Sequence, residues 1–219
     1  MIFLGGFMKV FVLLISYLFI YSFSFSNLID KHLYENLNEP NLNKQVLNIA
    51  LEGLAETDVK NKNIITIIDY TKSANEKRMF VIDLKKEKVL FSTYVAHGKN
   101  SGGEFAQNFS NTVNSKKSSI GFFKTSKPYR GIHGYSLRID GLEKGINDNA
   151  YKRNIVIHGA TYVNEKYIQR NGRLGRSWGC PAIPFNLTKD VINTIKNGTL
   201  IYINGNLQSY KKRTKYAIL

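Results

Sequence analysis

The chain has 219 residues, 43% of them hydrophobic, which is enough to bury one domain core and too apolar for a disordered chain. Lysine and arginine number 31 against 16 acidic residues, and the formal charge of +15 favours an anionic partner such as nucleic acid, anionic lipid or an acidic wall polymer. A single cysteine, Cys180, excludes an internal disulfide and any zinc module built from several cysteines.

The first 26 residues have the pattern of an export signal. Lys9 is the only charge, an apolar run follows over residues 10–21, and Ser24 and Ser26 match the small-x-small pattern of a signal-peptidase site. The run is shorter than the roughly 20 residues that a membrane span needs. We therefore expect residues 1–26 to be a signal peptide, with an uncleaved membrane anchor as the alternative. Export to the periplasm or cell envelope argues against nucleic acid as the anionic partner.

Residues 27–62 are expected to be helical. One apolar stripe at helical spacing runs along the second half of this segment: Leu42, Val46, Ile49, Ala50 and Leu54. Pro40 favours a helix start, so a shorter helix is expected before it, over residues 28–37. Amphipathic stripes are mostly core faces, and we expect this extension to pack on the main domain as a structural cap.

From residue 64 onward the pattern changes to that of strands. Runs rich in β-branched and aromatic residues predict strands at Ile64–Asp69, Met79–Leu84, Val89–Val95, Ser136–Asp140, Asn154–Ile157 and Leu200–Ile203. The second and third of these flank a polar turn at residues 85–88 and predict a hairpin. A helix is predicted at Thr188–Lys196, with Gly198 ending it.

Two long loops, residues 97–119 and 160–184, separate the predicted strands. Loops of this length in a compact domain are usually functional. The pattern predicts a mainly β domain over residues 63–207, with the N-terminal helical extension and one or two short helices. Residues 208–219 form a basic tail that we expect to be solvated, with membrane or wall association as the alternative.

The chemistry is expected between residues 154 and 184. A buried strand delivers His158 and Gly159 at its end, and Ser177-Trp178-Gly179-Cys180 follows in the long loop. A thiol is a useful nucleophile only as the thiolate, and its ordinary pKa leaves it mostly protonated at neutral pH. An imidazole within hydrogen-bonding distance supplies the missing base. The sequence therefore predicts a cysteine–histidine pair, His158 and Cys180.

The residues around Cys180 also suit a developing oxyanion. Gly179 lets the main chain approach a substrate carbonyl closely, and its N–H can point toward the oxyanion. Pro181 has no N–H to offer. The predicted oxyanion donors are the N–H groups of Gly179 and Cys180.

Together these motifs resemble the L,D-transpeptidases of bacterial cell-wall synthesis, the YkuD-like catalytic domains. That family carries a His-Gly at a strand end and a Ser/Thr-x-Gly-Cys further along, as His158-Gly159 and Ser177–Cys180 do here. The segments His97–Gly103 and Phe109–Asn111 are similar to elements of its murein L,D-transpeptidase catalytic-domain branch. The resemblance covers residues 64–204 and implies a β-sandwich or barrel catalytic domain that needs no cofactor.

The resemblance implies a covalent mechanism on peptidoglycan. His158 deprotonates Cys180 while the carbonyl of Gly159 orients the imidazole, and the thiolate attacks the meso-diaminopimelate carbonyl of a tetrapeptide stem and expels D-alanine. The thioester then passes to an amine of a second stem, forming a 3–3 cross-link, or to a lipoprotein lysine, or to water. The implied partners are peptidoglycan stem peptides and a wall-linked lipoprotein.

One position departs from the family pattern. Most members carry arginine two residues after the cysteine, where this chain has Ala182. An arginine there suits a substrate carboxylate, and Arg170, Arg173 or Arg176 could replace it. The further candidates for substrate binding are Ser177, Tyr129, His133 and Asn111, and Trp178 is either a pocket wall or a packing residue.

Several alternatives remain open at this stage. His133 and His97 also precede glycines and compete with His158 for the role of base. A hydrolase of the same fold, a carboxypeptidase acting on the same stems, would use the same residues. From other classes, a zinc enzyme could gather the three histidines and Cys180, although their spacings fit no compact ligand motif. A non-catalytic wall-binding module would need no such pair.

Overall fold

The computed structural model describes residues 32–206 and 208–216, and the chain divides into two compact units, residues 1–38 and 39–219. In the first unit, residues 32–37 are helical, within the short helix predicted before Pro40. The predicted export signal at residues 1–26 lies outside the described residues. Among the helices that are described, none is both long and apolar enough to span a membrane.

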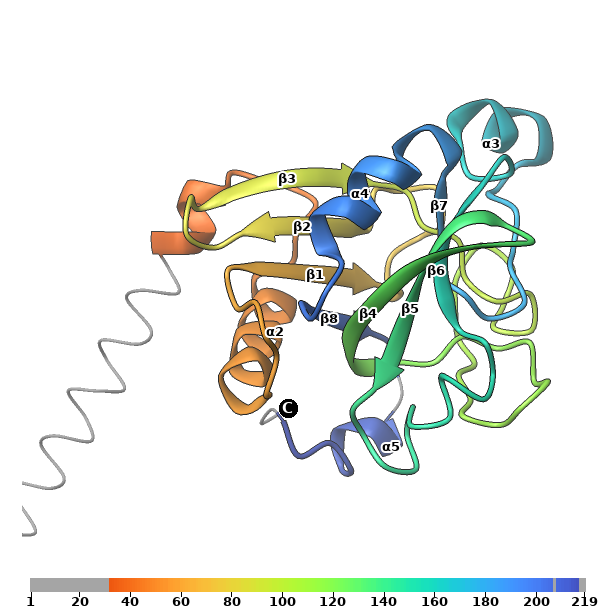
Figure 1. Cartoon of the computed structure of the whole chain (residues 1–219). Helices are drawn as coiled ribbons and strands as arrows, with labels where there is room; N and C mark the ends of the chain where they lie inside the picture. The colour runs from red at the N-terminus through yellow and green to blue at the C-terminus, as the bar shows by residue number, and fades with distance from the viewer. Residues whose placement is uncertain (1–31, 207, 217–219) are drawn as a thin grey trace, which may run out of the picture. The chain divides into compact units, whose positions relative to one another are not determined.

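The second unit is built on one sheet of eight strands, in the order β3-β2-β1-β8-β4-β5-β6-β7 (Figure 1). The strands are β1 (Ile64–Asp69), β2 (Met79–Asp83), β3 (Lys88–Thr93), β4 (Gly121–Gly131), β5 (Gly134–Gly141), β6 (Val156–Ala160), β7 (Ala182–Pro184) and β8 (Leu200–Asn204). The helices are α2 (Lys44–Glu56), α3 (Glu165–Asn171), α4 (Thr188–Ile195) and α5 (Gln208–Lys211). The pairs β1/β8 and β6/β7 are parallel, and the other neighbours are antiparallel.

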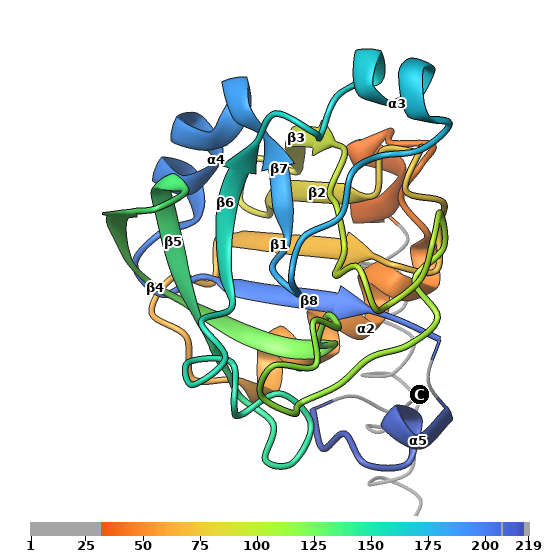
Figure 2. The same ribbon diagram turned by 90° about the vertical axis from the view of Figure 1, so that its right-hand side faces the viewer.

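The sheet curls until its two edges nearly meet. Ala96, just beyond β3, forms an isolated bridge to Ala182 in β7, and its N–H donates to the Ala182 carbonyl at 2.8 Å. Figure 2 shows the result, with β5, β6 and β7 crossing the direction of β1, β2 and β8. A curled sheet of this kind leaves little exposed strand edge. The expectation of a mainly β sandwich or barrel is confirmed.

Two helices cover this sheet. The apolar face of α4 contacts β1, β5 and β6, and its residues Val191, Ile192 and Ile195 are fully buried. The α2 helix begins after Asn43, whose side-chain oxygen accepts from the N–H groups of Gln45 and Val46, and it packs against β1 and β8. Part of the predicted helical extension therefore packs on the main domain as α2, which spans Lys44–Glu56 and does not reach residue 62.

The longest strand, β4, was not expected from the sequence. It contains Pro128, and its pairing with β5 is interrupted between Thr125 and Pro128. A proline cannot donate to a sheet, so the strand survives by placing it at an irregularity. Because that segment lacks a clean alternation of apolar residues, local pattern could not reveal it.

Two further elements correct the sequence expectations. The loop predicted over residues 160–184 contains α3, which begins after Asn164 and ends at Gly172 in the left-handed conformation. The strand predicted to end at Ile157 instead continues as β6 to Ala160, because β7 pairs with it in parallel from His158 onward. His158 therefore lies within a strand and not at its end.

Candidate active site

Cys180 lies in the turn that leads from α3 into β7, beside the first residue of β6. Its partly buried sulfur accepts a hydrogen bond from the Val156 N–H and donates one to the Asn154 carbonyl, each at 3.5 Å. Burial raises the pKa of the Cys180 thiol above its ordinary value. The Val156 N–H and the charge of Arg153 oppose that rise and favour the thiolate. A nucleophile in this setting depends on a base.

His158 is in β6, two residues beyond the point where the sulfur touches the strand, and it pairs in register with Ala182. Its Nδ1 lies 3.1 Å from the Gly159 carbonyl oxygen, which can only accept. Nδ1 therefore carries the hydrogen, and Nε2 is the nitrogen available as a base. This geometry matches the orienting role that the family resemblance implied for Gly159.

The surroundings of His158 keep it neutral. Burial lowers its pKa, and the neighbouring His133 lowers it further by charge repulsion. The two rings are stacked with centroids 4.3 Å apart and an interplanar angle of 19°. His133 itself is exposed on the β4–β5 hairpin. Among the rival histidines, His133 thus lies against the predicted base and is positioned to tune it.

Cys180 precedes β7, the strand that pairs with β6, and both hydrogen bonds of its thiol go to main-chain atoms. Among the described residues, no hydrogen bond joins the thiol to His158. Catalytic hydrogen bonds are often long in ligand-free structures and tighten when substrate binds. The arrangement is compatible with a nucleophile and a base that come together when substrate binds.

The turn that carries Cys180 is braced by Ser177. Its buried hydroxyl donates to the Cys180 carbonyl at 2.6 Å and accepts from the Gly179 N–H at 3.0 Å. The Gly179 N–H is therefore occupied inside the turn, which corrects its predicted role as an oxyanion donor. Ser177 holds the shape of the turn, and the substrate contact predicted for it stays a prediction. No backbone hydrogen bond of the Cys180 N–H is found in the described part of the chain, so its predicted role as an oxyanion donor stays open to it.

Two glycines allow the nucleophile turn to pack against the loop over residues 97–119. Gly179 has φ +127°, a conformation that favours glycine, and a Cβ on it would lie 2.8 Å from the Lys117 carbonyl oxygen. A Cβ on Gly98 would lie 2.9 Å from the Gly179 Cα. The two main chains thus touch directly, and any side chain at either position would push Cys180 out of place.

Arg153 is a site residue that sequence reasoning missed. Its guanidinium donates to the carbonyls of Ser110 and Lys117 and to the hydroxyls of Ser119 and Ser115. Its buried Nε–H has no hydrogen-bond partner. Arg153 therefore ties the long loop to the strand that carries His158, while its charge lowers the pKa of the Cys180 thiol. Its only sequence signal is a basic residue just before a predicted strand.

The arginines that were predicted to replace the missing one are directed elsewhere. Arg176 Nη1 donates to the carbonyls of Lys99 and Gly102, at 3.1 and 2.9 Å. Arg173 Nη1 donates to the carbonyl of Leu174 at 2.9 Å. Arg170 lies exposed in the last turn of α3. The position that departs from the family pattern, Ala182, is fully buried in β7.

The remaining substrate-binding candidates have structural partners. Asn111 donates to the Asp148 carboxylate at 2.7 Å and accepts from the Asn149 N–H, so it fastens two loops together. Tyr129 lies under the guanidinium of Arg138, 4.8 Å from its ring centroid. These contacts give both residues a role in holding the frame of the site.

His97, the other rival base, is part of the support behind the site. Its buried Nδ1 accepts from Arg78 Nη2 at 2.9 Å, and its Nε2–H faces the Gly102 carbonyl at 3.4 Å. Burial lowers the pKa of His97 to about 4, and the Arg78 charge acts in the same direction. His97 is therefore neutral, with both ring nitrogens engaged. Over the described residues, no three His, Cys, Asp or Glu side chains are grouped so that they could hold a metal ion.

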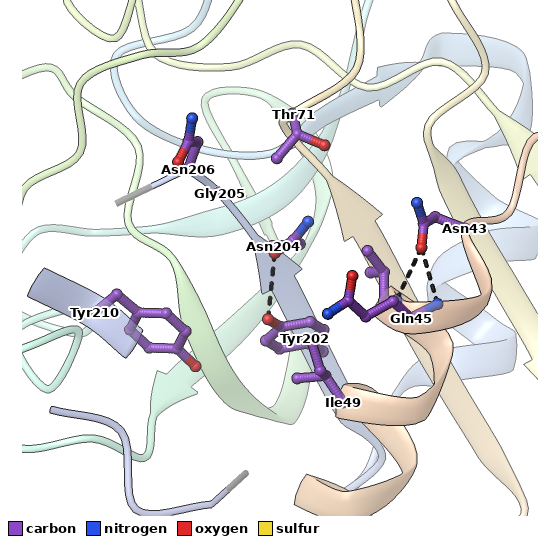
Figure 3. Close-up of a pocket in the computed structure, with 10 residues that line it drawn as sticks. Asn43, Gln45, Ile49, Thr71, Tyr202, Asn204, Gly205, Asn206 and Tyr210 are labelled. Carbon is purple, nitrogen blue, oxygen red and sulfur yellow. Dashed lines mark hydrogen bonds between the residues drawn. The ribbon is translucent and has the colours of Figure 1, made fainter. Parts of the chain in front are cut away.

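Among the cavities of the described residues, two differ in their relation to this site. One of about 520 Å³ lies between the tip of the β4–β5 hairpin and α4, with His133 and Phe185 in its lining. It therefore adjoins the residue stacked on His158. The other is shown in Figure 3 and is lined by Asn43, Asn204 and Tyr210 among others. It shares no residue with the site described above.

A family model described as the L,D-transpeptidase catalytic domain matches residues 38–204. Similar solved structures include an L,D-transpeptidase from Mycobacterium smegmatis, with 13% identity, coverage of 65% of this chain and 59% of that chain, and a TM-score of 0.40. Another is an L,D-transpeptidase from Xylanimonas cellulosilytica, with 13% identity, coverages of 64% and 60%, and a TM-score of 0.40.

A third is the helical cell shape determining protein Pgp2 from Campylobacter jejuni, with 14% identity, coverages of 71% and 55%, and a TM-score of 0.44. The chain spans less than two thirds of each of these solved chains. The search of curated proteins found no significant match. The family match runs from just before α2 to the end of β8 and includes His158 and Cys180, so this chain belongs to the L,D-transpeptidase catalytic-domain family.

Proposed function

We propose that this protein is an exported cysteine acyltransferase that acts on peptidoglycan stem peptides. Family membership supports the reaction class. The observation that carries the assignment of residues is the tautomer of His158, whose Nδ1–H is held by the Gly159 carbonyl on the strand beside Cys180. This leaves Nε2 as a neutral proton acceptor on the strand that the Cys180 thiol contacts, and burial keeps that thiol protonated.

The first half of the proposed reaction forms a thioester. His158 Nε2 takes the thiol proton, and the sulfur attacks the carbonyl carbon of the third residue of a tetrapeptide stem, a meso-diaminopimelate. The Cys180 N–H stabilises the oxyanion that develops. The peptide bond to the terminal D-alanine then breaks, and the leaving amine takes the proton from the imidazolium. D-Alanine departs, and the acyl group remains on sulfur.

The second half returns the enzyme to its starting state. An amine of a second stem attacks the thioester carbonyl and gives up a proton to His158, which passes it to the departing sulfur. The product is a 3–3 cross-link. Attack by water instead yields a shortened stem, and attack by a lipoprotein lysine yields an attached protein. The acceptor decides which of the three outcomes is seen.

The test is incubation of the purified protein with disaccharide-tetrapeptide, followed by separation and mass measurement of the products. We expect release of D-alanine together with a cross-linked dimer, and neither from Cys180→Ser. A shortened monomer as the sole product would make the protein a carboxypeptidase of the same mechanism. Full turnover by Cys180→Ser would overturn the proposed function. Lys85→Ala, in the exposed β2–β3 turn, is the matched control and should behave as wild type.

A further inference from the structure

The only tryptophan of the chain stands exposed beside the nucleophile. Trp178 lies two residues before Cys180, and 72% of its surface is accessible. Single exposed apolar residues are common on protein surfaces and carry no meaning alone. The two lysines placed on this indole are what distinguish it.

Both lysines come from the loop over residues 97–119. The Lys116 ammonium lies 4.9 Å from the indole centroid, and that of Lys99 lies 6.0 Å from it. Cation–π attraction limits the freedom of these otherwise flexible side chains. Their main chains are fixed as well, because the Lys99 N–H donates to the Ser177 carbonyl at 2.8 Å and the Lys116 carbonyl accepts from Asn100 at 3.1 Å. Two ammonium groups are thus held together over one ring.

The backbone of Lys116 is strained. Its φ is +54°, in the left-handed region where a lysine is disfavoured and a glycine is not. Such conformations persist where the surrounding structure enforces them, and they are found more often at ligand clamps and active sites. Glycine would serve the fold better at this position, so the lysine side chain itself calls for an explanation.

The charge around the indole has no internal counterpart. The loop over residues 97–119 has three lysines and one acid, Glu104, which accepts a hydrogen bond from Ser73. The segment over residues 166–184 is basic and has no acid at all. Within the described residues, neither Lys99 nor Lys116 forms an ion pair. An anion is the complementary ligand.

We infer that Trp178, Lys99 and Lys116 form a lysine–indole clip that binds a free carboxylate of the stem peptide whose carbonyl is attacked by Cys180. The inference rests on the proposed function and deepens it. The family position for a carboxylate-binding arginine is here the buried Ala182, and Arg173 and Arg176 are directed at main-chain carbonyls. The clip supplies the missing positive charge from the facing loop. Because ammonium groups already lie over the indole, the ligand is an anion and not a sugar stacked on the ring.

The clip can be tested by fluorescence, because Trp178 is the only tryptophan. Cys180→Ser is titrated with a stem tetrapeptide that has free carboxylates and with the same peptide fully amidated. We expect the acid form to change the emission and to bind about tenfold more tightly, the effect of roughly one well-placed charge pair. Added salt should weaken it. Equal binding of the two peptides would overturn the clip.

Variants separate the clip from the proposed function. Lys99→Ala, Trp178→Leu and Lys116→Gly should each lower kcat/KM for acylation of Cys180 by the acid peptide, by about tenfold for the lysines. Their rate with iodoacetamide, a small neutral thiol reagent, should match that of wild type. Lys116→Gly should also keep the melting temperature, because glycine accepts the positive φ. Lys85→Ala is the control for loss of a surface charge.

The possible failures are distinct. If the wild type reacts with iodoacetamide but is acylated by no stem peptide, the proposed function fails. If the wild type is acylated and all three clip variants are acylated equally fast, the clip is wrong and the proposed function stands. A parallel loss of iodoacetamide reactivity would instead show that the three residues shape the nucleophile turn, which also overturns the clip.

Discussion

At the scale of single residues, the nucleophile and the base are each held away from the charged form. Burial raises the pKa of Cys180 and lowers that of His158, so the resting pair is a neutral thiol beside a neutral imidazole. Proton transfer then depends on the alignment of the two groups. The Gly159 carbonyl orients the His158 imidazole, and the Ser177 hydroxyl holds the turn that carries Cys180.

The first prediction concerns these two residues. Cys180 should be the only site of covalent modification by a carbapenem, since the family resemblance implies thioester formation with that class of β-lactam. Intact mass should rise by one adduct in wild type and not in Cys180→Ser. His158→Ala should slow acylation about 100-fold at neutral pH, the usual contribution of a general base. The acylation rate of His158→Ala should recover partly at a pH where solvent can deprotonate the thiol.

The other histidines provide the controls for this assignment. His97→Ala and His133→Ala should show no comparable recovery with pH, because neither supplies the base. His133→Phe keeps a stacked ring but removes its charge, so the pKa of His158 should rise and the acidic limb of the rate profile should move to higher pH. Recovery in His133→Ala alongside normal acylation in His158→Ala would reverse the assignment of the base.

The second prediction concerns Arg153. Its charge lowers the pKa of Cys180, so Arg153→Met should move the pH midpoint of iodoacetamide alkylation upward and slow alkylation at neutral pH. Arg153→Lys keeps a charge while losing most of the loop hydrogen bonds. If the lysine variant alkylates like the methionine variant, the loop contacts matter and the charge does not. A wild-type pH profile in both would remove Arg153 from the site.

At the scale of elements, α2 is fitted to the sheet through a glycine. A Cβ on Gly53 would lie 2.1 Å from the ring of Phe122, which is itself stacked on Tyr202 with centroids 4.6 Å apart. Gly53→Ala should therefore lower the free energy of unfolding by about 1–3 kcal/mol through overpacking. The higher helix propensity of alanine alone would raise the free energy of unfolding by about 1 kcal/mol. The sign of the measured change therefore shows which of the two effects dominates.

Chemical denaturation of two backgrounds measures this coupling. In Phe122→Leu, where the smaller side chain leaves room, Gly53→Ala should cost much less than in wild type. An equal cost in both backgrounds would show that α2 does not pack on β4 through this pair. Packing of Gly53 against Phe122 would also explain how the helical extension stabilises the fold. That the segment before residue 63 contributes no catalytic residue stays a prediction.

The C-terminal segment is an element that the sequence did not predict. The tail was expected to be solvated, yet Tyr210 and Thr214 donate to the buried Glu143 carboxylate, at 3.3 and 2.6 Å, and the Phe122 N–H donates to it at 2.8 Å. The segment therefore packs on the loop after β5. Isolated basic residues gave no sign of this, because the partner is a carboxylate about 70 residues away in sequence.

Glu143 yields the fourth prediction. Burial raises its pKa, so from the ordinary value of 4.5 up to the raised value the folded state binds more protons than the unfolded state. Stability should fall as pH rises through that window. Glu143→Gln should remove this fall and raise the neutral-pH melting temperature, whereas the exposed control Glu56→Gln should not. A steeper fall in Glu143→Gln would contradict the assignment.

At the scale of the whole molecule, buried Arg78 joins the frame of the sheet to the site. It donates to the Val95 carbonyl at 3.1 and 2.8 Å and to the Lys72 carbonyl at 2.9 Å, besides its bond to His97. His97 begins the loop that packs on Gly179. The fold and the nucleophile turn therefore share one network of hydrogen bonds.

The fifth prediction follows from that network. The pKa of His97 is about 4 in the folded state and near its ordinary 6.5 when unfolded, so acidification through this window protonates only the unfolded chain. The free energy of unfolding should fall by up to about 3 kcal/mol between these pH values. Denaturation curves of wild type and His97→Asn measure it. An equally steep fall in His97→Asn would show that other groups are responsible.

Some of this structure is determined by the sequence directly. The β-branched runs of β1 and β8 and the amphipathic pattern of α4 identify these elements within a residue or two, because side-chain periodicity is a local property. The pairing of His158 with Cys180 as base and nucleophile was predicted from the chemistry of a thiol that needs a base, and it stays a prediction. Reactive residue types in a setting that does not suit a packed core indicate a site from sequence alone.

Other features exist only through contacts between distant segments. The extension of β6 through His158 requires β7, the capture of the Gly179 N–H requires the Ser177 hydroxyl, and the position of Arg153 requires the loop over residues 97–119. None of these features produces a periodic pattern in the sequence, because the curl of the sheet, and not spacing along the chain, brings the partners together. The sequence determined which groups can react, and the tertiary structure decided which hydrogen bonds and charges act on them.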